Sequence, residues 1–407
     1  MEAYPINKPI TLEDIEDLAA QARAGLASVA EVMLAPKGEK TPPTFTTAKL
    51  GELVGMTPQK IDYRAKKNGD LPAGTLNASG SRRTFSLQEA RTWARNLRKG
   101  KFRPTLLNGA LLDASVITLA NFKGGSTKTT TSVNLAQALS LRGHRVLFID
   151  MDPQGSATTL FGVSPHTQVG DMETVLALCV EPDHESAQAS IEYAVRKTYW
   201  DGIDLVPANT QLYGAEFMLP GRQMREPQFE FWRVIENALQ QARKDYDIII
   251  IDTSPSLSYL TINAMAAADG IIMPCPPENL DFASSVEFWG LFLDLAHSLG
   301  KYRSSKTYDF LQVVLSKVAN TSGANAVSDW MRKSYAPYVC PVEIPHSSTA
   351  SNAAAEFGSV YDLQVTSANS KTIKRAMDAY EGLADTIEAD INRAWARKLQ
   401  AATPKVA

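Results

Sequence analysis

Short runs of apolar residues alternate with longer amphipathic segments along residues 105–407. Continuous apolar runs are typical of strands buried on both faces of a sheet, and a period of about 3.6 residues is typical of helices. The clearest helical patterns cover residues 130–142, 229–243 and 371–399. This alternation predicts an α/β fold with a mostly parallel sheet flanked by helices. The expected strands are Val116–Ala120, Val146–Ile149, Ile203–Pro207, Ile248–Ile251, Gly270–Met273, Leu311–Leu315 and Val339–Ile344.

A different apolar pattern occupies the N-terminal part of the chain. Thr11 can cap a helix there, and the acidic residues after it suit the positive end of the helix dipole. The helix either packs against its own chain or joins two copies of the chain, and the second interpretation predicts a dimer that needs no ligand. Its apolar residues recur at alternating three- and four-residue steps, as in a coiled-coil seam: Leu12, Ile15, Ala19, Ala22, Leu26, Val29 and Met33.

A small domain is expected between this helix and the α/β part, after a linker that contains proline and glycine. Short helices are predicted over residues 46–54 and 59–67, with a turn at Gly55 between them. Arg82–Phe85 is a candidate strand or wing, and Ser86 begins a last helix with the pattern of a capping box. We therefore expect three parts, which are residues 1–40, 41–104 and 105–407.

The near-neutral formal charge of −3 hides a strong asymmetry between these parts. Residues 41–104 carry 13 Lys and Arg against 4 Asp and Glu, a net charge of +9. Residues 105–407 carry 24 against 33, a net charge of −9. A compact basic segment inside an acidic protein favours contact with a polyanion.

Composition excludes several classes of protein. Hydrophobic residues make up 44% and charged residues 21% of the chain, which excludes a disordered or collagen-like protein. No apolar run approaches the ~20 residues that span a bilayer, and the acidic N-terminus lacks the apolar core of a signal peptide. The three cysteines stand far apart, which argues against a disulfide framework or a cysteine zinc site. We expect a cytoplasmic protein without a membrane partner.

Residues 116–130 join an apolar strand to a helix through a glycine loop. Gly124 and Gly125 let backbone N–H groups approach an anion, and the helix that follows directs its own N–H groups and dipole at the same point. Lys128 is placed to reach the β- and γ-phosphates of a nucleotide, and the Thr129 hydroxyl is placed to bind Mg²⁺. The strict pattern G-x-x-x-x-G-K-[ST] is not met, because its glycines fall on Phe122 and Thr127.

Three aspartates follow apolar strands of the same sheet. Asp150 and Asp152 end one strand about 20 residues after the loop, and Asp252 ends a strand of four isoleucines. The carboxyl ends of parallel strands line the ligand crevice of an open α/β sheet, so these carboxylates can converge beside Lys128 and Thr129. A Mg²⁺-nucleotide would compensate their buried charge.

The segment KGGSTKT, Lys123–Thr129, resembles the deviant Walker A box of the ParA/MinD ATPases, whose hallmark is the extra lysine, here Lys123. Asp150–Gln154 is similar to the D-x-D-P-Q switch segment of that family, and Ile248–Asp252 to its Walker B strand. The resemblance covers about residues 115–365. Thr127 departs from it, because the family usually has glycine before the second lysine.

This resemblance implies a P-loop NTPase that binds ATP or ADP with Mg²⁺ and forms an ATP sandwich dimer. The implied catalytic residues are Lys123, which would reach the partner's phosphates, Lys128, and Asp152, which would position or activate the attacking water. The implied metal set is Thr129, Asp150, Asp152 and Asp252. The implied nucleotide contacts are Lys123, Gly124, Gly125, Ser126, Thr127, Lys128, Thr129, Thr130, Asp252 and Pro345, the last near the base.

Residues 46–67 and 82–97 also resemble the reading head of MerR-like regulators. An N-terminal helix and a winged helix-turn-helix before the ATPase are typical of long plasmid-type members of the ParA family. A small basic adaptor with a solvated face is the alternative. The expected operator contacts are Gln59, Lys60, Tyr63, Arg64, Lys66, Lys67, Arg82 and Arg83. Candidates for non-specific DNA contacts of the ATP dimer are Arg332, Lys333, Lys371, Lys374 and Arg375.

The expected function is therefore ATP-dependent partition of a plasmid or secondary chromosome by a nucleoid-associated homodimer. The resemblance implies that a ParB-like centromere-binding protein stimulates hydrolysis and that the chain also binds operator DNA to repress its own operon. Two alternatives stay open, which are a nucleotide-switched transcriptional repressor without a partition role and a MinD-like positioning ATPase.

Overall fold

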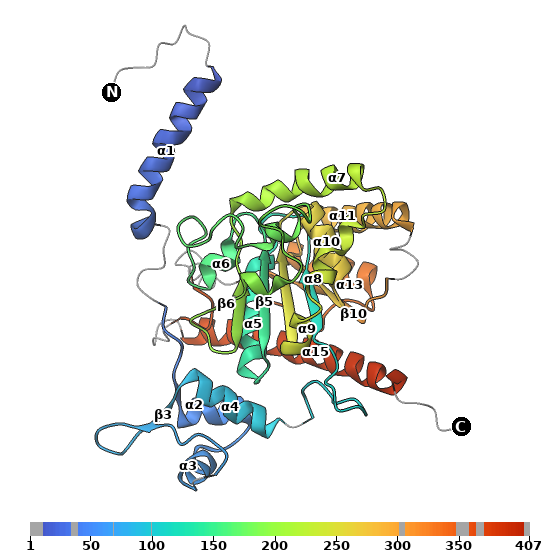
Figure 1. Cartoon of the computed structure of the whole chain (residues 1–407). Coiled ribbons are helices and arrows are strands. Elements are labelled where there is room, and N and C mark those ends of the chain that lie inside the picture. The colour runs from blue at the N-terminus through green and yellow to red at the C-terminus, as the bar shows by residue number, and fades with distance from the viewer. Residues whose placement is uncertain are drawn as a thin grey trace.

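The computed structural model describes residues 11–33, 40–67, 69–98, 100–300, 306–346, 358–363 and 370–402. Figure 1 shows an N-terminal helix, a small unit of short helices and strands, and a larger layered α/β domain. We call the small unit, residues 45–97, the head. Within the described residues, no helix is both long and apolar enough to cross a bilayer.

A seven-stranded sheet forms the centre of the α/β domain. Its strand order is β10-β9-β4-β8-β5-β7-β6, and all neighbouring strands are parallel except the edge pair β6–β7. The sheet confirms six of the predicted strands, and the short β6 was not predicted. The strands are β4 (Ser115–Leu119), β5 (Val146–Met151), β6 (Arg196–Lys197), β7 (Ile203–Val206), β8 (Ile248–Thr253), β9 (Gly270–Cys275) and β10 (Phe310–Leu315).

Helices cover both faces of this sheet. The side chains of Ile248 and Ile250 pack in one core with α5 (Lys128–Leu141) and α15 (Ser370–Ala402), and those of Ile249 and Ile251 pack in a second core on the other face. The isoleucine run is therefore continuous because each face of β8 needs apolar side chains. The second core includes α7 (Ala215–Arg225), α8 (Val234–Ala238), α10 (Tyr259–Ala267), α11 (Asn279–Ser298) and α13 (Ser322–Tyr335).

Two predicted elements are wrong. Val339–Ile344 is not a strand, and the isolated bridges here join Val339 to Val313 and the following Pro345 to Val318. The ladder does not continue because the segment bulges: the Cys340 and Ile344 amides, four residues apart, bond to the β10 carbonyls of Val313 and Leu315, only two residues apart. The helix expected over 229–243 is broken into a 3₁₀ turn (Phe231–Arg233), α8, and α9 (Ala242–Asp245). Beyond α8 the carbonyls of Arg243 and Lys244 turn toward the Arg103 guanidinium.

The remaining helical elements of the α/β domain are short. They are α6 (Ser156–Leu160) and the 3₁₀ turns Val175–Leu178, Ile191–Ala194 and Thr210–Gly214.

The head contains the predicted helices and the predicted wing strand. Thr46 and Thr57 cap α2 and α3 through their side chains, Gly55 turns with φ +67°, and Ser86 and Glu89 form the capping box of α4. Strands β3 and β2 pair as an antiparallel hairpin with β1 on the other side of β3. The elements are β1 (Phe45–Thr46), α2 (Thr47–Val54), α3 (Pro58–Lys66), β2 (Thr75–Leu76), β3 (Arg83–Phe85) and α4 (Leu87–Leu97).

Helix α4 joins the head to the α/β domain. Arg91 donates to the carbonyls of Ser140 and His144, at 3.0 and 2.9 Å, and Arg95 donates to the Gly143 carbonyl at 2.7 Å. Ser140 lies in the last turn of α5, and Gly143 and His144 lie in the turn that follows it, close to the partial negative charge at the C-terminal end of the helix. The arginines of α4 therefore cap the helix that begins at Lys128.

A glycine at this junction gives a test of the docking. A Cβ at Gly143 would lie 2.9 Å from Arg95 Cα, and Gly143 has φ +96°, whereas Gly109 has φ +84° with open space around it. Gly109→Ala should cost about 1–2 kcal/mol of unfolding free energy from backbone strain alone. Gly143→Ala should cost about 1–3 kcal/mol more, because α4 must shift. Equal losses in urea unfolding of the two variants would contradict this docking.

The predicted N-terminal helix is α1 (Leu12–Met33), and Thr11 accepts a hydrogen bond from the Asp14 amide as its cap. The side chains of Leu12 and Ile15 are exposed. The side chains of residues 26–33, which include the second half of the predicted seam, lie outside the described residues.

Candidate nucleotide-binding site

The glycine loop connects β4 to α5 at the carboxyl end of the sheet. Asn121 shapes its start, because its amide donates to the Pro274 carbonyl and its Oδ1 accepts from the Lys123 amide. Thr127 adopts φ +73°, a left-handed conformation that a β-branched residue rarely accepts. The backbone thus has the conformation that glycine favours at this position of the family motif, and Thr127 adopts it although it has a branched side chain.

A cavity of 420 Å³ opens at this loop. It brings together most of the nucleotide contacts predicted from the sequence, from Gly124 to Thr130, with Asp152 and Pro345. Lys123, Asp150 and Asp252 are not among its lining residues. Further lining residues were not predicted: Ser156, Pro255, Lys317, Ile344, His346, Ala376 and Tyr380.

Lys128 is buried at the start of α5, and its Nζ donates to the Lys123 carbonyl at 3.3 Å. Burial lowers the pKa of this ammonium, and the charges of Asp252 and Asp152 oppose that shift. A desolvated cation with few competing partners is well suited to an oxyanion, since charge-assisted hydrogen bonds are strongest away from water.

Asp252 lies at the end of β8, opposite Asp150 in the parallel register. It is fully buried, and neither of its carboxylate oxygens has a hydrogen-bond partner. Burial raises its pKa to about 7, although the nearby Thr129 hydroxyl and the Lys128 ammonium oppose the shift. An orphaned buried carboxylate beside a threonine hydroxyl fits the surroundings of a hydrated Mg²⁺, which keeps several waters and few protein ligands.

The two aspartates of the switch segment have different surroundings. Asp150 accepts hydrogen bonds from the amide and hydroxyl of Thr158, at 2.8 and 2.7 Å, and from the Asp152 amide at 3.1 Å. Burial raises its pKa to about 8. Asp152 accepts from the Gln154 amide at 3.0 Å and lines the cavity. Asp150 therefore holds the segment in shape, and Asp152 presents its carboxylate to a ligand.

The signature lysine points away from the cavity toward a residue that sequence reasoning missed. Lys123 Nζ lies 3.7 Å from Asp281 Oδ2, and the Lys123 side chain is 38% exposed whereas that of Asp281 is 6% exposed. Burial raises the pKa of Asp281, and Lys123 opposes that shift. Asp281 stands in the first turn of α11, where an acidic residue is common, so its residue type gave no signal of this contact.

The predicted DNA contacts are only partly available. Most are exposed on the surface of the head: Gln59, Lys60, Tyr63, Arg64, Lys66, Lys67 and Arg82. Arg83 instead packs inward, where its guanidinium donates to the Ala73 carbonyl and lies 3.6 Å from Asp62. On the α/β domain, Arg332 pairs with Glu343, while the remaining candidates are exposed: Lys333 on α13 and Lys371, Lys374 and Arg375 on α15.

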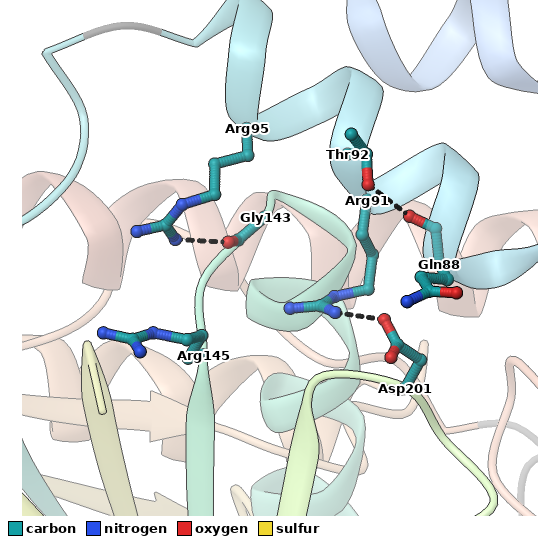
Figure 2. A pocket seen from close by; sticks show the side chains of 7 residues that line it. All are labelled: Gln88, Arg91, Thr92, Arg95, Gly143, Arg145 and Asp201. Carbon is teal, nitrogen blue, oxygen red and sulfur yellow. Dashed lines mark hydrogen bonds and ion pairs between the residues drawn. The ribbon is translucent and has the colours of Figure 1, made fainter. Parts of the chain in front are cut away.

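A second cavity, of 510 Å³, lies where α4 meets the α/β domain. Figure 2 shows three arginines around it, from α4 and from the start of β5, with Arg91 directed at Asp201 and Arg95 at Gly143. Arg145 contributes its backbone amide to Asp247. We assign this cavity a structural role rather than a part in the candidate site at the glycine loop. Arg91 and Arg95 already bond to groups of the α/β domain and hold the two parts together.

Comparison with known proteins places this site in a family. Residues 114–290 match the family model described as an AAA domain. A putative replication protein A of Rhizobium rhizogenes is 30% identical over 371 residues, which cover 89% of this chain and 90% of that protein. The chain belongs to the ParA/MinD family. The deviant Walker A loop, the switch aspartates and the Walker B strand described above are thus the motifs of a family member.

Solved structures agree with this assignment. A structure titled partition protein aligns over 93% of this chain and 98% of its own, with a TM-score of 0.63 and 17% identity, which shows the shared fold. Cobyrinic acid a,c-diamide synthase from Mycobacterium smegmatis, solved with a bound ATP analogue and magnesium, is 28% identical. Its alignment covers 67% of this chain and 94% of that protein, with a TM-score of 0.51.

Proposed function

We propose that this chain is an ATP-dependent DNA-partition ATPase that segregates a plasmid or a secondary chromosome. The observation that carries the proposal is one cavity lined by the loop, Lys128 and Asp152. The helix α5 begins at this cavity, and the basic head contacts the other end of α5. The relative named for replication and the partition protein that shares the fold over most of the chain support a role in DNA maintenance.

The site binds ATP or ADP with Mg²⁺ in this proposal. Lys128 and the loop amides hold the phosphates, and the Thr129 hydroxyl and Asp252 support the hydrated Mg²⁺, which supplies neutralisation of the phosphate charge. Asp152 orients the attacking water. Lys123 leaves Asp281 and reaches the phosphates of a second copy, so that hydrolysis requires a homodimer. A ParB-like centromere-binding protein stimulates this hydrolysis.

The α/β domain also contacts DNA in this proposal, and the ATP-bound dimer associates with the nucleoid. Residues 105–407 carry a net charge of −9, so a local patch must supply the attraction. Lys333, Lys371, Lys374 and Arg375 are exposed and available for it. Helix α1 supports a dimer without nucleotide, with Leu12 and Ile15 exposed on its described part.

The decisive experiment combines plasmid retention with turnover. A test plasmid that carries this gene and its neighbouring partition genes should be retained through unselected growth, and deletion of the gene should lower retention to the random-segregation level. Purified protein should hydrolyse ATP slowly and faster with DNA and the centromere-binding partner. Unchanged retention, with no turnover under any condition, would reject a partition ATPase.

The head is proposed to be a winged helix-turn-helix that reads an operator and represses the operon of this gene. Exposed polar side chains gather on α3, and Tyr63 is 66% exposed between them. The recognition helix of such a unit enters the major groove while the wing contacts phosphates. The second candidate function is a repressor without any partition role. Operator binding without any ATP turnover is the result that would favour it.

The wing arginines give opposite predictions. Arg82→Ala should weaken DNA binding to a similar extent for all sequences and reduce the slope of log K against log salt by about 1, because one phosphate contact is lost. Its thermal stability should not change, since Arg82 is exposed. Arg83→Ala should instead lower stability, because Arg83 holds the hairpin. Fluorescence anisotropy over a salt series and thermal melts of both variants test this pair.

A further inference from the structure

A lysine outside the Walker motifs contacts the glycine loop. The strand β10 ends at Leu315, and the next two residues reach the loop across the carboxyl edge of the sheet. Ser316 Oγ donates to the Ser126 carbonyl at 3.1 Å, and Lys317 Nζ donates to the Gly125 carbonyl at 2.8 Å. Two consecutive residues therefore hold two consecutive carbonyls of the phosphate loop.

Lys317 holds this position with an unusual backbone. Its φ is +51°, and Thr127 of the loop is the one other non-glycine residue with a positive φ in the part of the chain that the structure describes. Left-handed backbone is unfavourable for a residue with a Cβ, and such outliers gather at functional sites. The conformation is held from the next residue, because Val318 exchanges hydrogen bonds with Ile344 and His346.

The two contacts fix the direction of loop amides. In a trans peptide the C=O and the N–H of the next residue point in opposite directions. Holding the carbonyls of Gly125 and Ser126 from the β10 side therefore also sets the N–H groups of Ser126 and Thr127, which both line the nucleotide cavity. Backbone N–H groups are the main phosphate donors of such a loop, so their direction decides affinity.

Lys317 also forms part of the cavity wall. It lines the same cavity as Gly125 of the phosphate loop and as Ile344 and Pro345 of the segment expected near the base. The Lys317 ammonium also attracts the Asp281 carboxylate, which lies 3.7 Å from Lys123 Nζ. The hydrogen bond of the Lys317 ammonium goes to the Gly125 carbonyl of the loop.

We propose that Lys317 is a positioning residue for the nucleotide, which pins the Gly125 carbonyl and keeps the phosphate loop in its binding conformation. This inference rests on the proposed function as a nucleotide-binding ATPase. Lys317 acts through the loop, so its contribution is the same for ATP and for ADP.

The test separates the ammonium of Lys317 from its backbone. Lys317→Gly removes the ammonium and accepts the left-handed conformation without strain, Lys317→Met removes the charge alone, and Lys317→Arg keeps a donor that can reach the carbonyl. Lys244→Met, an exposed lysine of α9 remote from the cavity, is the matched control. Dissociation constants for Mg-ATP and Mg-ADP and the melting temperature of the nucleotide-free protein are measured for each variant.

We expect Lys317→Gly and Lys317→Met to bind both nucleotides about 10- to 100-fold more weakly, the range expected for one charge-assisted hydrogen bond. Lys317→Arg should bind within a few fold of wild type, and the melting temperature of Lys317→Gly should not fall. Unchanged affinity in Lys317→Gly overturns the inference, and so does weakening for ATP alone. If the wild type and Lys244→Met bind neither nucleotide, the proposed function itself fails.

Discussion

Lys128→Ala is expected to abolish measurable binding of ATP and ADP. Lys128 is a buried cation of the cavity, with Asp152 and Asp252 as its charged neighbours, and alanine leaves the phosphates close to these carboxylates without the buried cation. The loss should exceed about 100-fold in the dissociation constant, since a desolvated charge-assisted contact is removed and like charges are left together. Isothermal titration calorimetry of the Mg-nucleotides measures it directly.

The other lysine of the loop provides the control. Lys123→Ala should bind nucleotide close to the wild-type level, because the Lys123 side chain points to Asp281 rather than into the cavity of its own chain. It should lose hydrolysis if Lys123 serves a second copy. The assignment of the phosphate site is wrong if Lys128→Ala retains normal affinity, or if the two variants lose binding equally.

Asp247→Ala is expected to cause a large loss of stability. The Asp247 carboxylate is 1% exposed and lies 2.8 Å from Arg95, 3.1 Å from Arg103 and 3.9 Å from Arg145. Its removal leaves the Arg103 guanidinium, also 1% exposed, without a counterion, which typically costs about 3–5 kcal/mol. Urea unfolding measures this loss.

Asp201→Ala provides a matched control at the same junction. The Asp201 side chain pairs with Arg91 and is 39% exposed, and such solvent-exposed ion pairs contribute about 0–1 kcal/mol to the free energy of unfolding. A loss for Asp247→Ala as small as that for Asp201→Ala would show that the buried network carries little of the docking.

The same carboxylate gives a pH dependence with a defined sign. Burial acts to raise the pKa of Asp247, but Arg95, the Arg145 amide and His144 outweigh it, so the folded pKa lies below the ordinary value. The folded state therefore binds the proton less tightly than the unfolded state, and the stabilisation is present at neutral pH and lost as pH falls through the folded pKa. Asp247→Asn should weaken this acid sensitivity, measured as unfolding free energy from pH 7 to pH 3.

Most of the sheet could be predicted because its strands are buried on both faces. The run Ile248–Ile251 needs apolar side chains toward both cores, so its pattern is unambiguous. Segment 339–344 is also largely apolar, but it bulges: the Cys340 and Ile344 amides bond to β10 carbonyls that are only two residues apart, so no regular ladder forms. The segment over 229–243 has helical periodicity and is helical over Phe231–Arg233, α8 and α9, but the periodicity does not report the turn at residues 239–241. The Arg243 and Lys244 carbonyls bond to Arg103, a contact from more than a hundred residues away that a local pattern cannot report either.

The residues of the candidate site also fall into those that the local sequence predicts and those that it does not. Gly124, Gly125, Lys128 and Thr129 could be predicted because a phosphate loop is a local arrangement of strand, turn and helix. Asp281 and Lys317 could not, because each meets the loop only through the order of strands in the sheet. A signal did exist for Lys317, which is the second residue after β10 at the carboxyl edge, but the sequence alone does not say that β10 lies on the loop side of the sheet.

The docking of α4 limits how this protein can evolve by exchange of domains. Leu87 belongs to the apolar core shared with the sheet, Arg91 and Arg95 cap α5, and Gly143 and Gly202 have no room for a side chain beside these arginines. A foreign head would need the same leucine and the same two arginines at matching spacing. Point substitutions on the exposed side of α3 leave this joint intact, so they are the more accessible route by which the surface of the head can change.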